Sequence, residues 1–161
     1  MKRRKASKKS VIKKKQKIYI GIFIVVVLAV GVWALENYMS SPNVCINGKC
    51  FKMEIADTEA EKILGLSERE SLKENEGMIF VFSEPDDWGF WMHEMSFPLD
   101  IIWVDSEGII LAIGENLEPC PAEGDCPIYY SGGQAKYVLE INGGLSEKYG
   151  FEIEDLVLMK K

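Results

Sequence analysis

The feature that most constrains the fold is a stretch of 29 residues, Gly77 to Asp105, that is dense in large apolar side chains. It reads GMIFVFSEPDDWGFWMHEMSFPLDIIWVD and holds three of the four tryptophans, four of the seven phenylalanines and the only histidine. Aromatic and β-branched residues favour strands, and proline interrupts them. With Pro85 and Pro98 as interruptions, the stretch predicts three short strands whose side chains fill one small core.

Two local signals place a hairpin and a helix before this stretch. Asn47-Gly48 predicts a two-residue hairpin turn, because both turn positions need positive φ. Thr58 and Glu61 form a capping-box pattern at the start of a helix expected over 57–70. Gly65 lies inside that range and is a weak point or an early stop.

The rest of the chain adds mainly strands. We expect strands at 78–82, 99–104, 109–114, 134–141 and 155–159, and a short helix at 145–150. The strands at 99–104 and 109–114 should pair as a hairpin, because a tight turn joins them. The fold class predicted is α+β, mainly β: a small antiparallel β-barrel or rolled sheet with one or two short helices, behind an N-terminal transmembrane helix.

The N-terminal part of the chain differs sharply in charge from the rest. Residues 1–17 hold ten Lys or Arg and no acidic residue, whereas residues 18–161 hold nine basic and 25 acidic residues, a net charge of −16. Residues 18–35 carry no charge, and a helix of that length is about 27 Å long, close to the thickness of a bilayer's hydrocarbon core. Basic residues stay on the cytoplasmic side. The pattern therefore predicts a single-pass protein of the cell membrane with its C-terminal domain outside.

This topology divides the chain into four parts. They are a basic cytoplasmic tail (1–17), a transmembrane signal anchor (18–35), a tether (36–43) and an extracytoplasmic β-rich domain (44–161). A signal peptide cleaved after about Gly31 is the alternative, because the residues before this point supply a small-x-small pattern. The lipid bilayer is thus the expected partner of residues 18–35. The acidic domain is not expected to bind nucleic acid.

The four cysteines form two local pairs, Cys45 with Cys50 and Cys120 with Cys126. An even, pairwise count in a domain expected outside the cell predicts two disulfides and an oxidising compartment. A zinc site is the alternative, but neither pair has knuckle spacing with supporting ligands, so no metal site is expected. No cofactor is expected either, because the chain has no phosphate-cradling or dinucleotide-binding glycine motif.

Several short motifs occur in an order and spacing that are similar to one protein family. They are Gly65-Leu66 with Arg69, Gly77 to Phe82, Phe90-Trp91-Met92, Pro98 to Ile102, Cys120 with Cys126-Pro127, Tyr137 to Glu140 with Gly143-Gly144, and Asp155-Leu156-Val157. From about Lys52 to Met159 the chain resembles the bacterial and archaeal family named domain of unknown function 192. The resemblance implies a compact, outward-facing, β-rich domain behind a signal or anchor, and it supplies no reaction.

The chain departs from the family pattern at three positions. His93 and Glu94 stand where the family usually has a basic residue and an asparagine, and Ser67 stands where a methionine is common. If these positions contact a ligand, the departures imply a ligand of different identity in this protein.

Two carboxylates are weak candidates for catalysis. Asp100 lies on the same face of its expected strand as Ile102 and Val104, so its side chain should be partly buried and paired. It is either a ligand contact and general base or, as we favour, a structural acceptor for backbone N–H groups. Glu140 ends another expected strand, and if that strand brings it near Asp100, the two acids would form an acid/base pair of the glycosidase type.

Four residues are candidates for ligand binding: Trp91, His93, Glu94 and Asp100. Trp88 and Trp91 lie on opposite faces of their expected strand, so one should enter the core and the other could stack on a sugar ring. On a strand, His93 and Glu94 should likewise point to opposite faces, and they cannot form a dyad without a bulge. The four candidates are expected to converge at one end of the sheet.

Three functions are compatible with these patterns. The first is a membrane-anchored extracytoplasmic binding or accessory module for a small molecule, a glycan or a partner protein. The second is a glycan-directed hydrolase that uses Asp100 and Glu140. The third is a structural partner of envelope proteins. Because no nucleophile motif occurs, the sequence favours a protein that is not an enzyme.

Overall fold

The computed structural model describes residues 19–31, 42–120 and 125–160, which belong to two compact units divided after Ser40. In the first unit, residues 19–31 form a helix with exposed side chains. Among the helices of the described ranges, none combines the length and the apolar character that crossing a membrane requires. The predicted tail (1–17), the ends of the predicted anchor and most of the predicted tether lie outside the described residues.

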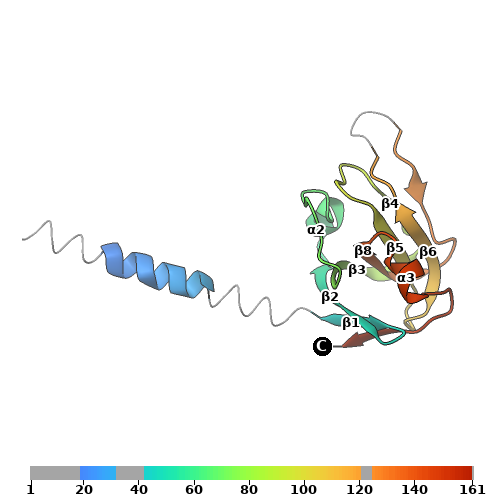
Figure 1. Ribbon diagram of the computed structural model, residues 1–161, viewed down its shortest axis with the longest axis horizontal. Helices are drawn as coiled ribbons and strands as arrows, with labels where there is room; N and C mark the ends of the chain where they lie inside the picture. Colours follow the sequence, from blue (N-terminus) through green and yellow to red (C-terminus); the bar gives the residue numbers. More distant parts are fainter. Residues whose placement is uncertain (1–18, 32–41, 121–124, 161) are drawn as a thin grey trace, which may run out of the picture. The chain divides into compact units, whose positions relative to one another are not determined.

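A seven-stranded sheet is the framework of the second unit, with the strand order β6-β5-β8-β3-β2-β1-β9 (Figure 1). Its strands are β1 (Asn43–Ile46), β2 (Lys49–Ala56), β3 (Glu76–Asp86), β5 (Leu99–Val104), β6 (Ile110–Leu117), β8 (Ala135–Asn142) and β9 (Val157–Lys160). Neighbouring strands are antiparallel except β2 and β3, which are parallel. A crossover that carries helix α2 (Glu59–Leu64) joins these two strands, because parallel neighbours cannot be joined by a tight turn. The unit is therefore α+β and mainly β, as predicted.

The sheet is curled, and its two edges meet near the starts of β6 and β9. The Ile110 N–H donates to the Asp155 carbonyl at 3.0 Å, and the Val157 N–H donates to the Gly108 carbonyl at 2.7 Å. Gly108 has φ 88°, and a Cβ atom there would lie 2.9 Å from the Val157 carbonyl oxygen. Glycine is therefore required at this position for the edges to approach.

Each face of the sheet packs against its own apolar core. All six residues of β5 are buried, and they alternate between the cores: Ile101 and Trp103 pack on one side, Ile102 and Val104 on the other. The alternation that the sequence predicts for this strand is confirmed. Helix α3 (Leu145–Tyr149) places Leu145 in the core of Ile102 and Val104.

The segment after β3 contains less strand than the sequence predicts. Only Phe90–Trp91 forms a strand, β4, and it pairs with β7 (Ile128–Tyr129) as a separate two-stranded sheet. The region 116–133 contributes part of β6 and all of β7. Prolines and turn residues on both sides keep β4 short.

Both predicted helices are present, and the first is shorter than predicted. The capping box is formed: the Thr58 side chain accepts the Glu61 N–H at 3.3 Å, and the Glu61 carboxylate accepts the Thr58 N–H at 3.0 Å. Helix α2 ends at Gly65, which has φ 52°, so the helix does not continue to Glu70. Helix α3 ends at Gly150 in the left-handed region, as predicted.

Both predicted disulfides are present, Cys45–Cys50 and Cys120–Cys126. Cys45 and Cys50 are directly opposed across the β1–β2 hairpin, whose turn is the predicted Asn47-Gly48 with φ 49° and 81°.

Removing the hairpin disulfide is expected to lower the free energy of unfolding by about 2 kcal/mol, because the loop that it closes is short. The Cys45→Ala/Cys50→Ala double variant, unfolded in urea beside the wild type, measures this loss. Equal midpoints and slopes for the two proteins under oxidising conditions would contradict the expectation.

Candidate functional site

The described part of the second unit contains a cavity of about 260 Å³ between α2, β3 and the segment around β4. Lys62 of α2, Phe80 and Phe82 of β3, Trp88 and Trp91 around β4, and Glu140 of β8 are among its lining residues. We call this cavity the aromatic pocket. Its wall joins three parts of the chain that are distant in sequence.

The aromatic side chains of the pocket hold one another in place. Phe82 and Trp88 are stacked with ring centroids 4.1 Å apart, and Phe80 meets Phe90 edge to face at 4.9 Å. The indole N–H of the fully buried Trp103 donates to the Trp88 carbonyl at 2.9 Å. This hydrogen bond ties the backbone at Trp88 to β5.

Glu140 is the buried carboxyl group of the pocket. Its side chain is 5% exposed, and none of the described residues supplies a hydrogen-bond partner to its Oε2 atom. Burial raises the pKa of Glu140 to about 8, because the charged form loses its hydration. At neutral pH the pocket therefore contains a carboxylic acid that can both donate and accept a hydrogen bond.

Trp88, another lining residue, carries a second buried polar atom. Its Nε1 atom is buried, and among the described residues it has no acceptor. Buried polar groups in proteins are nearly always paired, so two unpaired polar atoms on residues that line one cavity are unusual.

Charged and exposed side chains also line the pocket. Lys62 forms an ion pair with Glu59 at 3.2 Å, and its Nζ atom lies 4.9 Å from the centroid of the Phe82 ring. Ile63 and Trp91 line the pocket and are exposed, with 54% of Trp91 accessible. An exposed aromatic ring is thus available in the lining for stacking.

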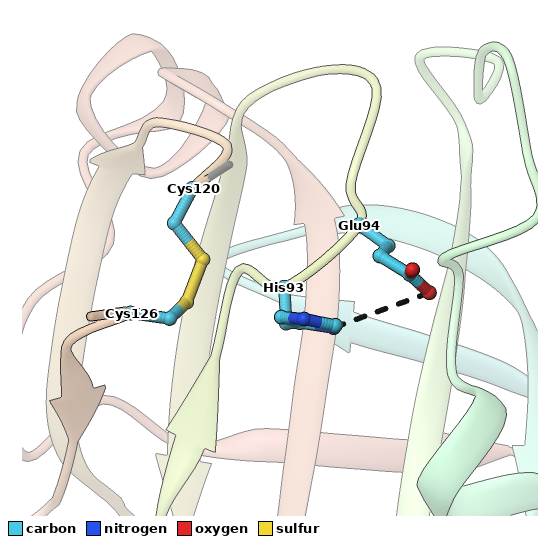
Figure 2. Close-up of a disulfide and its surroundings, with 4 residues drawn as sticks. All are labelled: His93, Glu94, Cys120 and Cys126. Atoms are coloured by element: carbon cyan, nitrogen blue, oxygen red, sulfur yellow. Dashed lines mark ion pairs between the residues drawn. A yellow bond between two sulfur atoms is a disulfide. The ribbon is translucent and has the colours of Figure 1, made fainter. Parts of the chain in front are cut away.

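Two of the four predicted ligand-binding residues, Trp91 and His93, line the pocket. The prediction that His93 and Glu94 point apart is wrong: His93 Nδ1 lies 4.0 Å from Glu94 Oε2 (Figure 2). The strand ends at Trp91 and Glu94 has φ 56°, so the alternation of a strand does not apply there.

Figure 2 shows His93 and Glu94 in the surroundings of the Cys120–Cys126 disulfide. The Cys120 N–H donates to the Met92 carbonyl at 3.0 Å.

Asp100 lies outside the pocket and is a structural acceptor. It is fully buried, and its carboxylate accepts the backbone N–H groups of Asn116 at 2.7 Å, Gly144 at 2.8 Å and Ser146 at 2.6 Å. Asp100 therefore ties β5 to the end of β6 and to the start of α3. The predicted convergence of Asp100 with Trp91 and His93 is not observed.

The predicted acid/base pair of Asp100 and Glu140 is not formed either. In the β5–β8 pairing, Asp100 is opposite Ile141 and Ile101 is opposite Glu140. Opposed residues share a face and adjacent residues do not, so the two carboxyl groups lie on opposite faces of the sheet. They cannot act together on one substrate.

No group of three His, Cys, Asp or Glu side chains with metal-binding geometry occurs within the described ranges.

A family model described as "Uncharacterized ACR" matches residues 43–159, which is most of the chain. The chain belongs to the DUF192 family. A solved structure from Novosphingobium aromaticivorans, described as a protein of unknown function, is 36% identical, with a TM-score of 0.64 over 73% of this chain and 83% of that one. A Sinorhizobium meliloti structure, described as a proposed transcription regulator, is 27% identical, with a TM-score of 0.65 over 73% of this chain and 91% of that one. The comparison with curated proteins gave no match.

The sequence alone does not single out several residues that line the pocket of this DUF192 domain. It places Lys62 in a helix and Phe80 and Phe82 in a core strand, and it relates Glu140 only to Asp100. One signal for its burial is present in the sequence, because Glu140 stands between Leu139 and Ile141 in an apolar strand, where an acid without a partner is costly.

Proposed function

We propose that the β-rich domain is a binding module whose small-molecule ligand occupies the aromatic pocket. The observation that carries this proposal is that two residues lining one cavity of about 260 Å³, Trp88 and Glu140, each have a buried polar atom without a partner among the described residues. An apolar cavity of about 150 Å³ already accommodates benzene. The aromatic pocket therefore has room for a ligand with one ring and a polar substituent.

Binding is favoured over hydrolysis by the position of the carboxyl groups. A glycosidase needs two acids that flank one bond. Asp100 and Glu140 lie on opposite faces of the sheet, and Asp100 is fully occupied by backbone donors. Glu140 alone, surrounded by aromatic side chains, is suited to recognising a ligand.

A glycan or a partner protein is the second candidate occupant. Trp91 and Ile128 are paired across β4 and β7, and both are exposed. An exposed aromatic ring beside the mouth of a pocket supports stacking of a sugar ring or docking of an apolar side chain.

We further propose that this module is held outside the cell membrane by the N-terminal segment. The charge contrast between residues 1–17 and the acidic domain supports this placement, as does the apolar run at 18–35. The two disulfides support it as well, because disulfides persist in oxidising compartments. Labelling of thiols in intact cells tests the placement: we expect no free thiol, and free thiols on the cytoplasmic side would contradict it.

Nuclear magnetic resonance of the full chain in detergent micelles tests the pocket. With ¹⁵N-labelled tryptophan, we expect the indole N–H signal of Trp88 to shift when a single-ring compound with a hydrogen-bond acceptor is added. The signal of Trp103, whose N–H is already bonded to the Trp88 carbonyl, is the internal control. The Trp88→Phe variant assigns the signal. If a panel of benzyl alcohol, benzylamine, phenol and benzoate leaves the Trp88 signal in place, the proposal is wrong.

A further inference from the structure

We propose that the ligand of the aromatic pocket is a small organic amine that also carries an oxygen acceptor, with its ammonium group beside Glu140 and its oxygen beside the Trp88 indole N–H. This inference rests on the proposed function, because it assigns a chemical class to the ligand of that same pocket. Three properties of the lining carry it.

The first property is the state of the charged side chains in the lining. Besides Glu140, the titratable residues among the described lining residues are Glu59 and Lys62 of α2 and His93 after β4. Glu59 and Lys62 neutralise each other in an ion pair, and His93 lies against Glu94. Glu140 alone has no such partner among the described residues. A cationic group on a ligand would satisfy it, whereas an anionic group would meet a second carboxyl group.

The second property is the aromatic wall, which already accommodates an ammonium group. Lys62 Nζ lies 4.9 Å from the centroid of the Phe82 ring. A cation within about 6 Å of a ring centroid is attracted by the ring's negative face. The rings of Phe80, Trp88 and Phe90 extend this surface within the same lining. An alkylammonium or arylalkylammonium ion in the pocket would therefore contact apolar aromatic rings and pair with the Glu140 carboxylate.

The third property is the charge of the chain after the basic tail. Residues 18–161 carry a net charge of −16, and a field of this sign concentrates cations at the surface and repels anions.

The Trp88 indole requires an oxygen acceptor on the ligand, because the indole N–H is a hydrogen-bond donor only. A hydroxyl or carbonyl oxygen on the amine supplies this acceptor.

Binding of a protonated amine must release a proton at neutral pH. The Glu140 carboxylic acid and the ligand's ammonium ion become a carboxylate–ammonium pair, and the carboxyl proton leaves to the solvent. No covalent bond to carbon forms or breaks. The affinity for the amine should therefore rise with pH up to about 8, the pKa of Glu140, by roughly tenfold per pH unit.

Isothermal titration calorimetry of the full chain in detergent micelles tests the inference with three matched probes. They are 2-amino-1-phenylethanol, which has both groups, 2-phenylethylamine, which lacks the hydroxyl, and 1-phenylethanol, which lacks the amine. We expect 2-amino-1-phenylethanol to bind at least tenfold more tightly at pH 8 than 1-phenylethanol. At pH 7, where Glu140 is mostly protonated, the measured heat should vary with the ionisation enthalpy of the buffer in proportion to about one released proton.

Two variants separate the contributions of the lining. Glu140→Gln should abolish both the tenfold preference for the amine and the proton release, while retaining the binding of 1-phenylethanol. Trp88→Phe should keep the proton release and bring the affinity for 2-amino-1-phenylethanol down to that of 2-phenylethylamine. Glu84→Gln, at an exposed position of β3 that is not among the lining residues, is the control and should leave the pH dependence in place.

The outcomes distinguish this inference from the proposed function. If 1-phenylethanol binds as tightly as the amines, with no proton release, the pocket is a binding site but not one for amines. The same conclusion follows if Glu140→Gln leaves the pH dependence unchanged. If none of the three probes binds and none shifts the Trp88 indole signal, both the inference and the proposed function are wrong.

Discussion

Replacing Asp100 with alanine is expected to lower the free energy of unfolding by about 3–5 kcal/mol. The carboxylate is fully buried and accepts the backbone N–H groups of Asn116, Gly144 and Ser146. Its removal leaves three donors unsatisfied where β5, β6 and α3 meet, and each such donor costs about 1–3 kcal/mol. Urea unfolding followed by tryptophan fluorescence measures the loss.

An exposed aspartate with a similar set of partners is the matched control. Asp87 accepts the Gly132 N–H at 2.9 Å and the Ser131 hydroxyl at 3.0 Å, but it is open to solvent. Water can replace it, so Asp87→Ala should cost less than about 1 kcal/mol. Asp100→Asn should be intermediate, because its amide keeps one acceptor oxygen. A loss for Asp100→Ala no larger than that for Asp87→Ala would remove the structural role that we assign to this residue.

Replacing Glu140 with glutamine is expected to stabilise the domain increasingly as the pH rises from about 5 to about 8. The pKa of Glu140 is raised by burial from 4.5 to about 8 in the folded protein, whereas the unfolded chain ionises at its ordinary value. Between these values the unfolded state binds fewer protons than the folded state, so the stability of the wild type falls with rising pH. The full loss is on the order of 5 kcal/mol.

The difference between wild type and Glu140→Gln isolates this effect from the other acidic residues. Glu74 contributes in the opposite sense, because hydrogen bonds from Lys148 and Tyr149 lower its pKa to about 2. The contribution of Glu74 cancels when the two proteins are compared at each pH. Glu84→Gln, at an exposed position of β3, is the control. Unfolding in urea at pH 5, 6, 7 and 8 should give a widening gap for Glu140→Gln, and a constant gap would show that Glu140 is not buried as described.

The local parts of the fold could be predicted from the sequence because short-range chemistry decides them. The Asn47-Gly48 turn, the Thr58–Glu61 capping box and the alternation along β5 each depend on residues that are close in the chain. The two disulfides follow from cysteines that are near in sequence.

The pocket could not be predicted, because it depends on strand register and on distant pairing. Asp100 and Glu140 both lie in apolar strands, and a shift of one residue in the β5–β8 pairing would place them on the same face. The sequence alone does not determine the register of the β5–β8 pairing. In the same way, nothing local indicates that β2 and β3 pair in parallel and thereby bring Lys62 of α2 over Phe82.

The crossover between β2 and β3 forms one wall of the aromatic pocket and is not itself part of the sheet. Residues 57–75 leave the sheet at one parallel strand and return at the next, and α2 within them lines the pocket. Under the proposed binding function, we expect homologues that differ in this crossover to differ in ligand selectivity while keeping the same sheet. Grafting the crossover from one member of the family onto another should therefore transfer the ligand preference together with the crossover.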